Sequence, residues 1–141
     1  MKKALFFVSL FVLPLFAFAL PAPTGFTVSF DGTTIATDWD DVLGATKYSV
    51  NIVAEYDLDG DAIPDISIDY DFGTSDRTDG GLMSDSYLNI PYDALLYDSD
   101  GDLVGDLYPI LAAARVKALN PGKGNGRQNN AFYSPFVPFV P

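Results

Sequence analysis

The chain has 141 residues, of which 48% are hydrophobic and 14% aromatic, and this suits one domain with a buried core. Its 19 acidic residues far outnumber its 8 lysines and arginines, so the formal net charge is -11. This sign disfavours a nucleic-acid partner, because binding to phosphate needs clustered cations.

The chain contains no histidine and no cysteine. This excludes Ser-His-Asp and Cys-His catalysis, the usual zinc and copper sites, and disulfide bonds. Glu55 is the only glutamate, so nearly all of the acidic charge is aspartate. Aspartate is preferred where a short carboxylate sits in a turn and points at a ligand.

Residues 1–19 read as a secretory signal peptide. Lys2 and Lys3 form a basic start, residues 4–16 are almost entirely apolar, and Ala17-Phe18-Ala19 is a cleavage site of the A-x-A type. The alternative is an uncleaved membrane anchor, but the apolar run is short and Pro14 interrupts it. We therefore expect a secreted or cell-surface protein with no stable membrane span after cleavage, and the signal has a bacterial character.

Residues 20–141 are expected to form a single all-β domain. After a proline-rich lead-in at 20–25, apolar and polar residues alternate with the period of a half-buried strand. No segment shows a convincing helical period. The expected strands are 26–30, 35–39, 47–52, 66–71, 87–90, 108–120 and one within the final segment 131–141.

The segment 108–120 is predicted to be the longest strand. Its alanine run leaves a short helix as the alternative. Arg115 and Lys117 alternate with small or apolar residues, and this favours a strand. The face expected to be buried consists of Ala112, Ala114, Val116 and Ala118.

Several of these residues together resemble a fibronectin type III domain. The chain has a Pro-x-Pro-x-Gly lead-in, Trp39 at the end of one strand, Val42-x-Gly44-Ala45, then Tyr48-x-Val50, and much later Arg115-Val116-Lys117-Ala118-Leu119-Asn120-Pro121-Gly122. The resemblance implies an antiparallel β-sandwich of about seven strands, fibronectin type III or immunoglobulin-like, in which the tryptophan and the following tyrosine pack in the core.

The chain also departs from that family. Ala112 stands where the family usually has a tyrosine, so the hydrogen-bonded tyrosine corner is not expected in its usual place. The two acidic loops, 57–65 and 98–106, look like insertions.

These two loops share the pattern D-x-D-G-D-x-x-x-D. They resemble the calcium-binding repeats of thrombospondin type 3, except that Ala62 and Leu103 replace the usual second glycine. Carboxylates at every second residue of a loop converge, and each like-charged pair at about 4 Å costs on the order of 1 kcal/mol even in water. A cation would relieve this repulsion.

Calcium fits best, because it accepts six to eight oxygen ligands with loose geometry. We expect two ions. The first would be bound by Asp57, Asp59, Asp61, Asp65 and the Ile63 carbonyl, and the second by Asp98, Asp100, Asp102, Asp106 and the Val104 carbonyl. Asp69, Asp71 and Asp93 could complete a shell, but no spacing selects them. The alternative is two solvated turns, since Asp-Gly is ordinary turn chemistry.

The end of the chain, 131–141, is conspicuously apolar. One interpretation is the last strand of the sandwich, confined to an edge by Pro135 and Pro138. The other is a docking segment for the next subunit, because an exposed apolar tail has to be covered. The residues expected at such an assembly interface are Phe136, Val137, Phe139 and Val140.

The expected role is a non-catalytic extracellular structural protein, stabilised by calcium, that self-associates into a surface filament. An enzyme is not expected, because a glycosidase needs two carboxylates across a sugar cleft, one of them held protonated. The alternative is a monomeric adhesion or carbohydrate-binding module. Its stacking surface would draw on Tyr56, Tyr70, Tyr87, Tyr92 and Tyr97.

Overall fold

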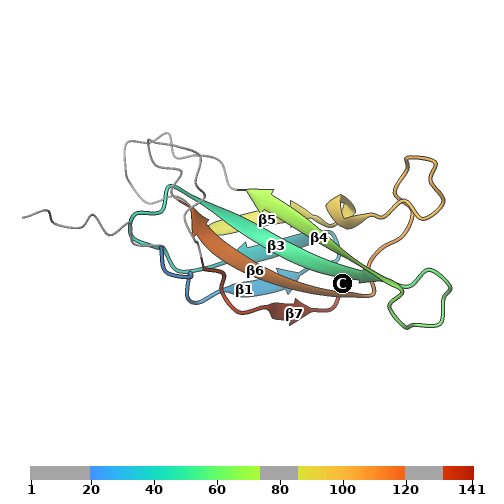
Figure 1. Ribbon diagram of the computed structural model, residues 1–141, viewed down its shortest axis with the longest axis horizontal. Helices are drawn as coiled ribbons and strands as arrows, with labels where there is room; N and C mark the ends of the chain where they lie inside the picture. Colours follow the sequence, from blue (N-terminus) through green and yellow to red (C-terminus); the bar gives the residue numbers. More distant parts are fainter. Residues whose placement is uncertain (1–19, 74–85, 120–131) are drawn as a thin grey trace, which may run out of the picture.

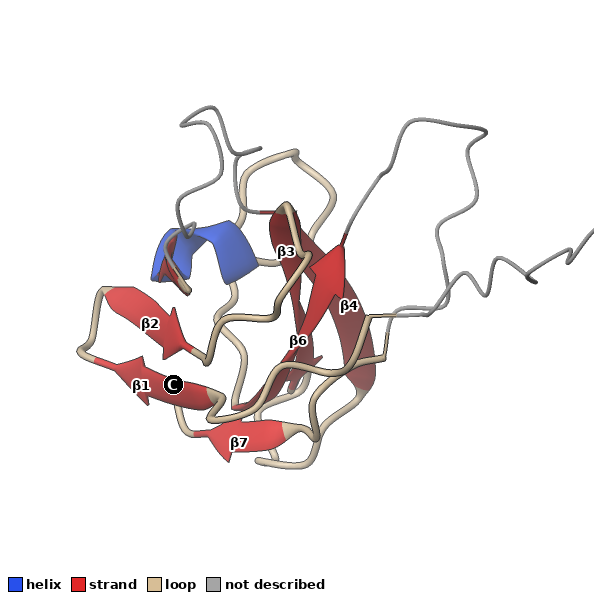
Figure 2. Ribbon diagram, turned by 90° about the vertical axis from the view of Figure 1, so that its left-hand side faces the viewer, coloured by secondary structure: helices blue, strands red, loops and turns tan. Residues whose placement is uncertain are grey.

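A computed structural model describes residues 20–73, 86–119 and 132–141. The predicted signal peptide lies outside these residues. Within them the chain forms two antiparallel sheets that face each other across one core (Figures 1 and 2). This confirms the prediction of an all-β sandwich with seven strands.

One sheet has three strands and the other has four. The first has the order β1 (Thr27–Phe30), β2 (Thr34–Asp38), β5 (Tyr87–Pro91). The second has the order β4 (Ile66–Gly73), β3 (Lys47–Tyr56), β6 (Leu111–Leu119), β7 (Val137–Phe139). Consecutive strands therefore cross between the sheets three times, from β2 to β3, from β4 to β5 and from β5 to β6. Such crossings are typical of immunoglobulin-like sandwiches.

Two details of the sequence prediction are wrong. The longest strand is β3, with 10 residues, whereas β6 has 9 and begins only at Leu111. Pro109 has no N–H to donate to a ladder, so the regular strand starts after it. A short 3₁₀ helix, η1 (Tyr92–Leu95), was also not expected; it follows Pro91, which ends β5.

The alternation of the strands places the core as predicted. Ile35, Thr37 and Trp39 are buried on one side. Facing them from the other sheet are the inward residues of β3 and β6, among which the alanines of β6 leave room for the larger side chains of β3. The buried face of β6 consists of Ala112, Ala114, Val116 and Ala118, as predicted.

Trp39 and Tyr48 pin the two sheets together. Their ring centroids are 5.1 Å apart with 58° between the planes, so the expected packing of this pair is confirmed. The Tyr48 hydroxyl accepts a hydrogen bond from the Val42 N–H at 2.9 Å. It thereby anchors the turn Val42–Ala45, in which the Ala45 N–H bonds the Val42 carbonyl and Gly44 has φ of 88°.

The C-terminal segment forms the last strand of the sandwich. β7 pairs with β6, and Phe139 packs against the core. Arg115 lies over the rings of Tyr133, at 4.0 Å, and Phe136, at 4.3 Å, which holds the approach to β7 against the sheet. Val140 is 76% exposed. β7 is thus the edge strand that the first interpretation of the tail predicted. A docking role for the tail would depend on its exposed residues, such as Val140.

β3 runs from one end of the domain to the other (Figure 1). It starts next to the Val42–Ala45 turn and ends at the loop 57–65. We call these the turn end and the loop end. No helix in the described part of the chain has both the length and the apolar character needed to cross a bilayer.

Candidate metal centres

Both acidic loops protrude from the loop end (Figure 1). Each is closed at its base by a tyrosine. The Asp65 N–H donates to the Tyr56 carbonyl at 2.8 Å, and the Asp106 N–H donates to the Tyr97 carbonyl at 2.9 Å. In the next position Ile66 pairs with Tyr56, and Leu107 pairs with Tyr97. The two loops are therefore attached to the sandwich in the same register.

The two loops also share one backbone conformation. Gly60 and Gly101 have φ of 83° and 82°, and Ala62 and Leu103 have φ of 65° and 70°. Ala62 and Leu103 are the residues that replace the second glycine of the repeat. A left-handed conformation costs a non-glycine residue roughly 1–2 kcal/mol. The loops thus retain the glycine-type conformation although glycine is absent.

The first aspartate of each loop organises the backbone from inside. Asp57 accepts from the N–H groups of Gly60 and Ala62, at 2.6 and 2.7 Å. Asp98 does the same for Gly101 and Leu103, at 2.6 and 2.8 Å. These bonds stabilise the strained conformation of residues 62 and 103, because the N–H groups of both residues donate to the carboxylate in it.

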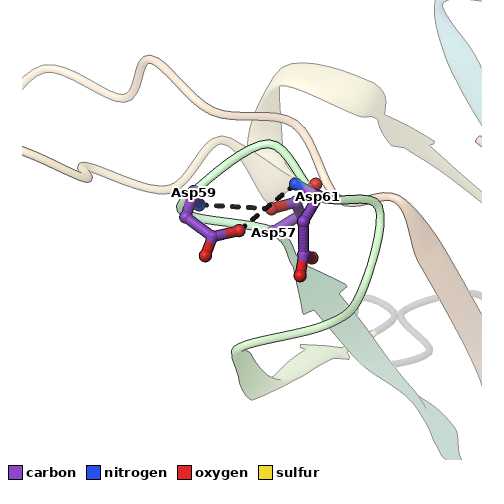
Figure 3. Close-up of side chains that lie close together, drawn as sticks. All are labelled: Asp57, Asp59 and Asp61. Carbon is purple, nitrogen blue, oxygen red and sulfur yellow. Dashed lines mark hydrogen bonds between the residues drawn. The ribbon is translucent and has the colours of Figure 1, made fainter.

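The aspartates at the third and fifth positions of each loop also accept hydrogen bonds from the loop backbone. Asp59 accepts from the Asp61 N–H at 3.2 Å, and Asp61 accepts from the Ile63 N–H at 2.8 Å. Asp100 and Asp102 accept from the equivalent N–H groups at 3.2 and 2.8 Å. As a result three carboxylates gather in each loop, with one oxygen from each lying within 4.8 Å of the others. Figure 3 shows the first of these triplets. The two triplets are Asp57, Asp59 and Asp61, and Asp98, Asp100 and Asp102.

The last aspartate of each loop has a different partner. Asp65 accepts from the Leu58 N–H at 2.7 Å. Asp106 accepts from the Ser99 N–H at 3.0 Å and from the Ser99 hydroxyl at 2.9 Å. These carboxylates tie the end of each loop back to its start and are not among the residues of the two triplets. Their predicted role as ligands, and that of the Ile63 and Val104 carbonyls, stays a prediction.

The hydrogen bonds also shift the acidity of the first aspartates. Desolvation raises the pKa of Asp57, but the hydrogen bonds from the backbone N–H groups, led by those of Ala62 and Gly60, together lower it by more. The pKa of Asp57 therefore lies below its ordinary value. The pKa of Asp98 is lowered in the same way by Leu103 and Gly101. Both carboxylates are therefore charged at neutral pH.

The three other candidate ligands lie elsewhere. Asp69 and Asp71 are on the outer face of β4, within 3.5 Å of donors on Asn51 and Ser49. Asp93 accepts from the Tyr108 hydroxyl at 2.6 Å. The described geometry places none of the three in either triplet.

The donor set fits a hard cation. Each triplet offers carboxylate oxygen only, in an exposed loop with room for water. Oxygen ligands suit calcium or magnesium, whereas zinc prefers nitrogen and sulfur. Each loop could therefore hold a metal ion.

Sequence reasoning missed how the loops are joined at their bases. The repeat extends one residue further than the acidic pattern, since Tyr56 and Tyr97 each precede the first aspartate. Their rings are 5.4 Å apart. The Tyr56 hydroxyl donates to the Leu95 carbonyl at 2.6 Å, and burial raises its pKa. A search for internal repeats would have found the two tyrosines.

Comparison with known proteins gives no match: no protein-family model, no curated protein and no solved structure is significantly similar to this chain. The chemistry of the loops is therefore argued from their own geometry.

Proposed function

We propose that the chain is a non-catalytic extracellular structural protein, a self-assembling subunit of a surface filament whose loop end is stabilised by two calcium ions. The observation that carries the calcium part is the agreement between the loops. Two segments 41 residues apart have nearly equal φ angles at two equivalent positions and the same pattern of hydrogen bonds around three carboxylates. Such agreement supports one shared ligand chemistry.

Calcium is preferred over magnesium for a geometric reason. Magnesium needs a nearly ideal octahedron and keeps several waters, whereas calcium accepts irregular loops. At millimolar calcium and a dissociation constant of about 0.1 mM, each ion would stabilise the domain by about 1.4 kcal/mol. This matters in a domain that has no cysteine and therefore no disulfide.

The sandwich itself we propose to be fibronectin type III-like. The packing of Trp39 on Tyr48 and the arrangement of three strands against four support this. Position 112 is an alanine, but Tyr56 on β3 donates its hydroxyl to a backbone carbonyl, that of Leu95. Modules of this type commonly act as spacers or adhesion units, which agrees with a structural role.

The filament is tested by sedimentation of the chain from Leu20 in millimolar calcium and again after chelation. Polymers that shrink or loosen on chelation support the proposal, and a monomer under both conditions contradicts it. Deletion of the tail is a poor test because Phe139 packs against the core. Val140→Asn is a better test of docking through the tail, because it changes an exposed residue and leaves β7 in place.

A second candidate is a carbohydrate-binding module, and one observation favours it. Tyr108 stacks on Tyr92 at 4.4 Å with 9° between the planes, its hydroxyl bonds Asp93, and it is 42% exposed. A rigid exposed ring beside a carboxylate suits a sugar. Binding of the monomer to an immobilised glycan, lost in Tyr108→Ala, would favour this candidate. Of the tyrosines expected from the sequence, Tyr56 is fully buried and Tyr87 is exposed.

A further inference from the structure

Large aliphatic side chains are exposed at the tips of both acidic loops. Leu103 is 93% exposed, and Val104 in the same loop and Leu58 and Ile63 in the other loop are exposed as well. Both loops protrude from the same end of the domain (Figure 1). We call these residues the apolar tips: Leu58, Ile63, Leu103 and Val104.

Folding of the domain does not account for Leu103. Its φ of 70° is a conformation in which glycine is favoured, and its side chain has almost no contact with the rest of the domain. A leucine here strains the backbone and leaves an apolar group in water. Both penalties are offset if the side chain is buried in a contact with something else.

The turn end carries a matching feature. Leu43 is 98% exposed at the tip of the Val42–Ala45 turn. The Tyr48 hydroxyl holds the Val42 N–H, so the turn is anchored to the core and presents Leu43 rigidly. The domain thus has exposed aliphatic side chains at both its turn end and its loop end.

Charge decides which ends can meet. The two loops carry eight aspartates, so contact between two loop ends would bring 16 carboxylates together. The cations of the described residues are Lys47, Arg115 and Lys117; Lys47 and Lys117 lie in the half of the β3–β6 ladder nearer the turn end, and Arg115 lies at its middle pair. Asp38, Asp40 and Asp41 also lie at that end, and hydroxyl groups of Thr24 and Ser86 donate to Asp40 and Asp41. The turn end therefore carries three carboxylates among the described residues, against eight at the loop end. A loop end therefore meets a turn end with less repulsion than another loop end.

We propose that the apolar tips of one copy dock on the turn around Leu43 of the next copy, so that the chains assemble head to tail. Such a contact joins two different surfaces and does not close on itself, which generates an open filament. The inference rests on the proposed filament and specifies its interface. Calcium favours the contact, since it lowers the charge of the loops and fixes their tips.

The test uses two neutral substitutions, Leu103→Asn and Leu43→Asn. Asparagine tolerates a positive φ and removes the apolar group in both places. By sedimentation in millimolar calcium, each variant alone needs at least about a tenfold higher concentration to assemble, because a buried leucine contributes that factor or more. When the two variants are mixed in equal amounts, they form dimers. The intact apolar tips of Leu43→Asn can still dock on the intact turn of Leu103→Asn, and no other contact remains. Val140→Asn, the matched control, assembles like the wild type.

Other outcomes overturn the inference in distinguishable ways. Dimers of either variant alone indicate a contact between like ends. Loss of assembly in Val140→Asn only indicates docking through the tail, and the proposed filament then stands without this interface. A wild-type monomer in calcium and after chelation contradicts both proposals. If that monomer instead sediments with phosphatidylserine vesicles in calcium, and Leu103→Asn does not, the apolar tips bind lipid.

Discussion

The rings of Tyr56 and Tyr97 lie 5.4 Å apart with 42° between their planes, and each tyrosine directly precedes the first aspartate of an acidic loop. The bases of the two loops are thus joined by a contact inside the domain. The Tyr56 hydroxyl extends this contact by donating to the Leu95 carbonyl, and it lies 2.8 Å from the Tyr70 hydroxyl. The loop end is therefore anchored on one buried tyrosine.

Tyr56→Phe is expected to destabilise the domain. The substitution leaves the Leu95 carbonyl and the Tyr70 hydroxyl without this partner, and an unsatisfied buried group costs about 1–3 kcal/mol. Urea unfolding of the chelated monomer measures the change. Tyr87→Phe, at an exposed position, is the control and is expected to change the free energy of unfolding by less than about 0.5 kcal/mol. Equal stability of the two variants would contradict the role given to Tyr56.

Much of the fold follows from the sequence, because alternation with period two determines which side of each strand is buried. Ile35, Thr37 and Trp39 illustrate this. The helix η1 could not be predicted, since four residues after Pro91 carry no periodic signal. The start of β6 was misplaced because apolar residues continue through Pro109, where the ladder cannot.

For the candidate metal centres, the sequence predicted which residues come together but not the role of each one. The acidic pattern predicted that carboxylates converge, and three per loop do so. The pattern could not separate Asp57, which organises the backbone and belongs to a triplet, from Asp65, which joins the loop's end to its start. Both roles need a short carboxylate in a turn, so composition alone does not distinguish them. Nor could the pattern reveal that Leu103 would be exposed, because exposure depends on how the loop protrudes.

Asp59→Asn is expected to stabilise the domain after chelation and to reduce the stabilisation that calcium adds. After chelation the substitution removes one of three converging charges and raises the free energy of unfolding by up to about 1 kcal/mol. In millimolar calcium it removes a ligand, so the ion binds more weakly and contributes less than the about 1.4 kcal/mol expected for an intact site. Thermal unfolding under both conditions measures the two effects. Asp69→Asn, on the outer face of β4, is the control; calcium should stabilise this variant as much as it stabilises the wild type.

Leu103→Gly is expected to stabilise the chelated monomer by about 0.5–1 kcal/mol. Glycine removes the strain of the positive φ, roughly 1–2 kcal/mol, and loses part of this gain through the greater entropy of the unfolded chain. Almost no packing is lost, since the side chain is exposed. Leu43→Gly is the matched control, because Leu43 is equally exposed but is not among the described residues with positive φ. Glycine there should destabilise, and a gain at both positions would refute the strain at Leu103.

Acid is expected to weaken the hydrogen bonds that Asp57 and Asp98 accept within the two loops, over the same range of pH in both. In the folded domain the pKa values of Asp57 and Asp98 are lowered, through N–H donors that outweigh desolvation. A carboxylate with a lowered folded pKa contributes stability that is fully present above its unfolded value of about 3.9 and is lost as the pH falls through the folded value. The hydrogen exchange of the Ala62 and Leu103 amides, which these carboxylates hold, should therefore lose protection below about pH 4. In Asp57→Asn that dependence should disappear at Ala62 and persist at Leu103, because each loop has its own aspartate. Loss of protection at both amides in this variant would mean that the loops open as one unit through Tyr56 and Tyr97.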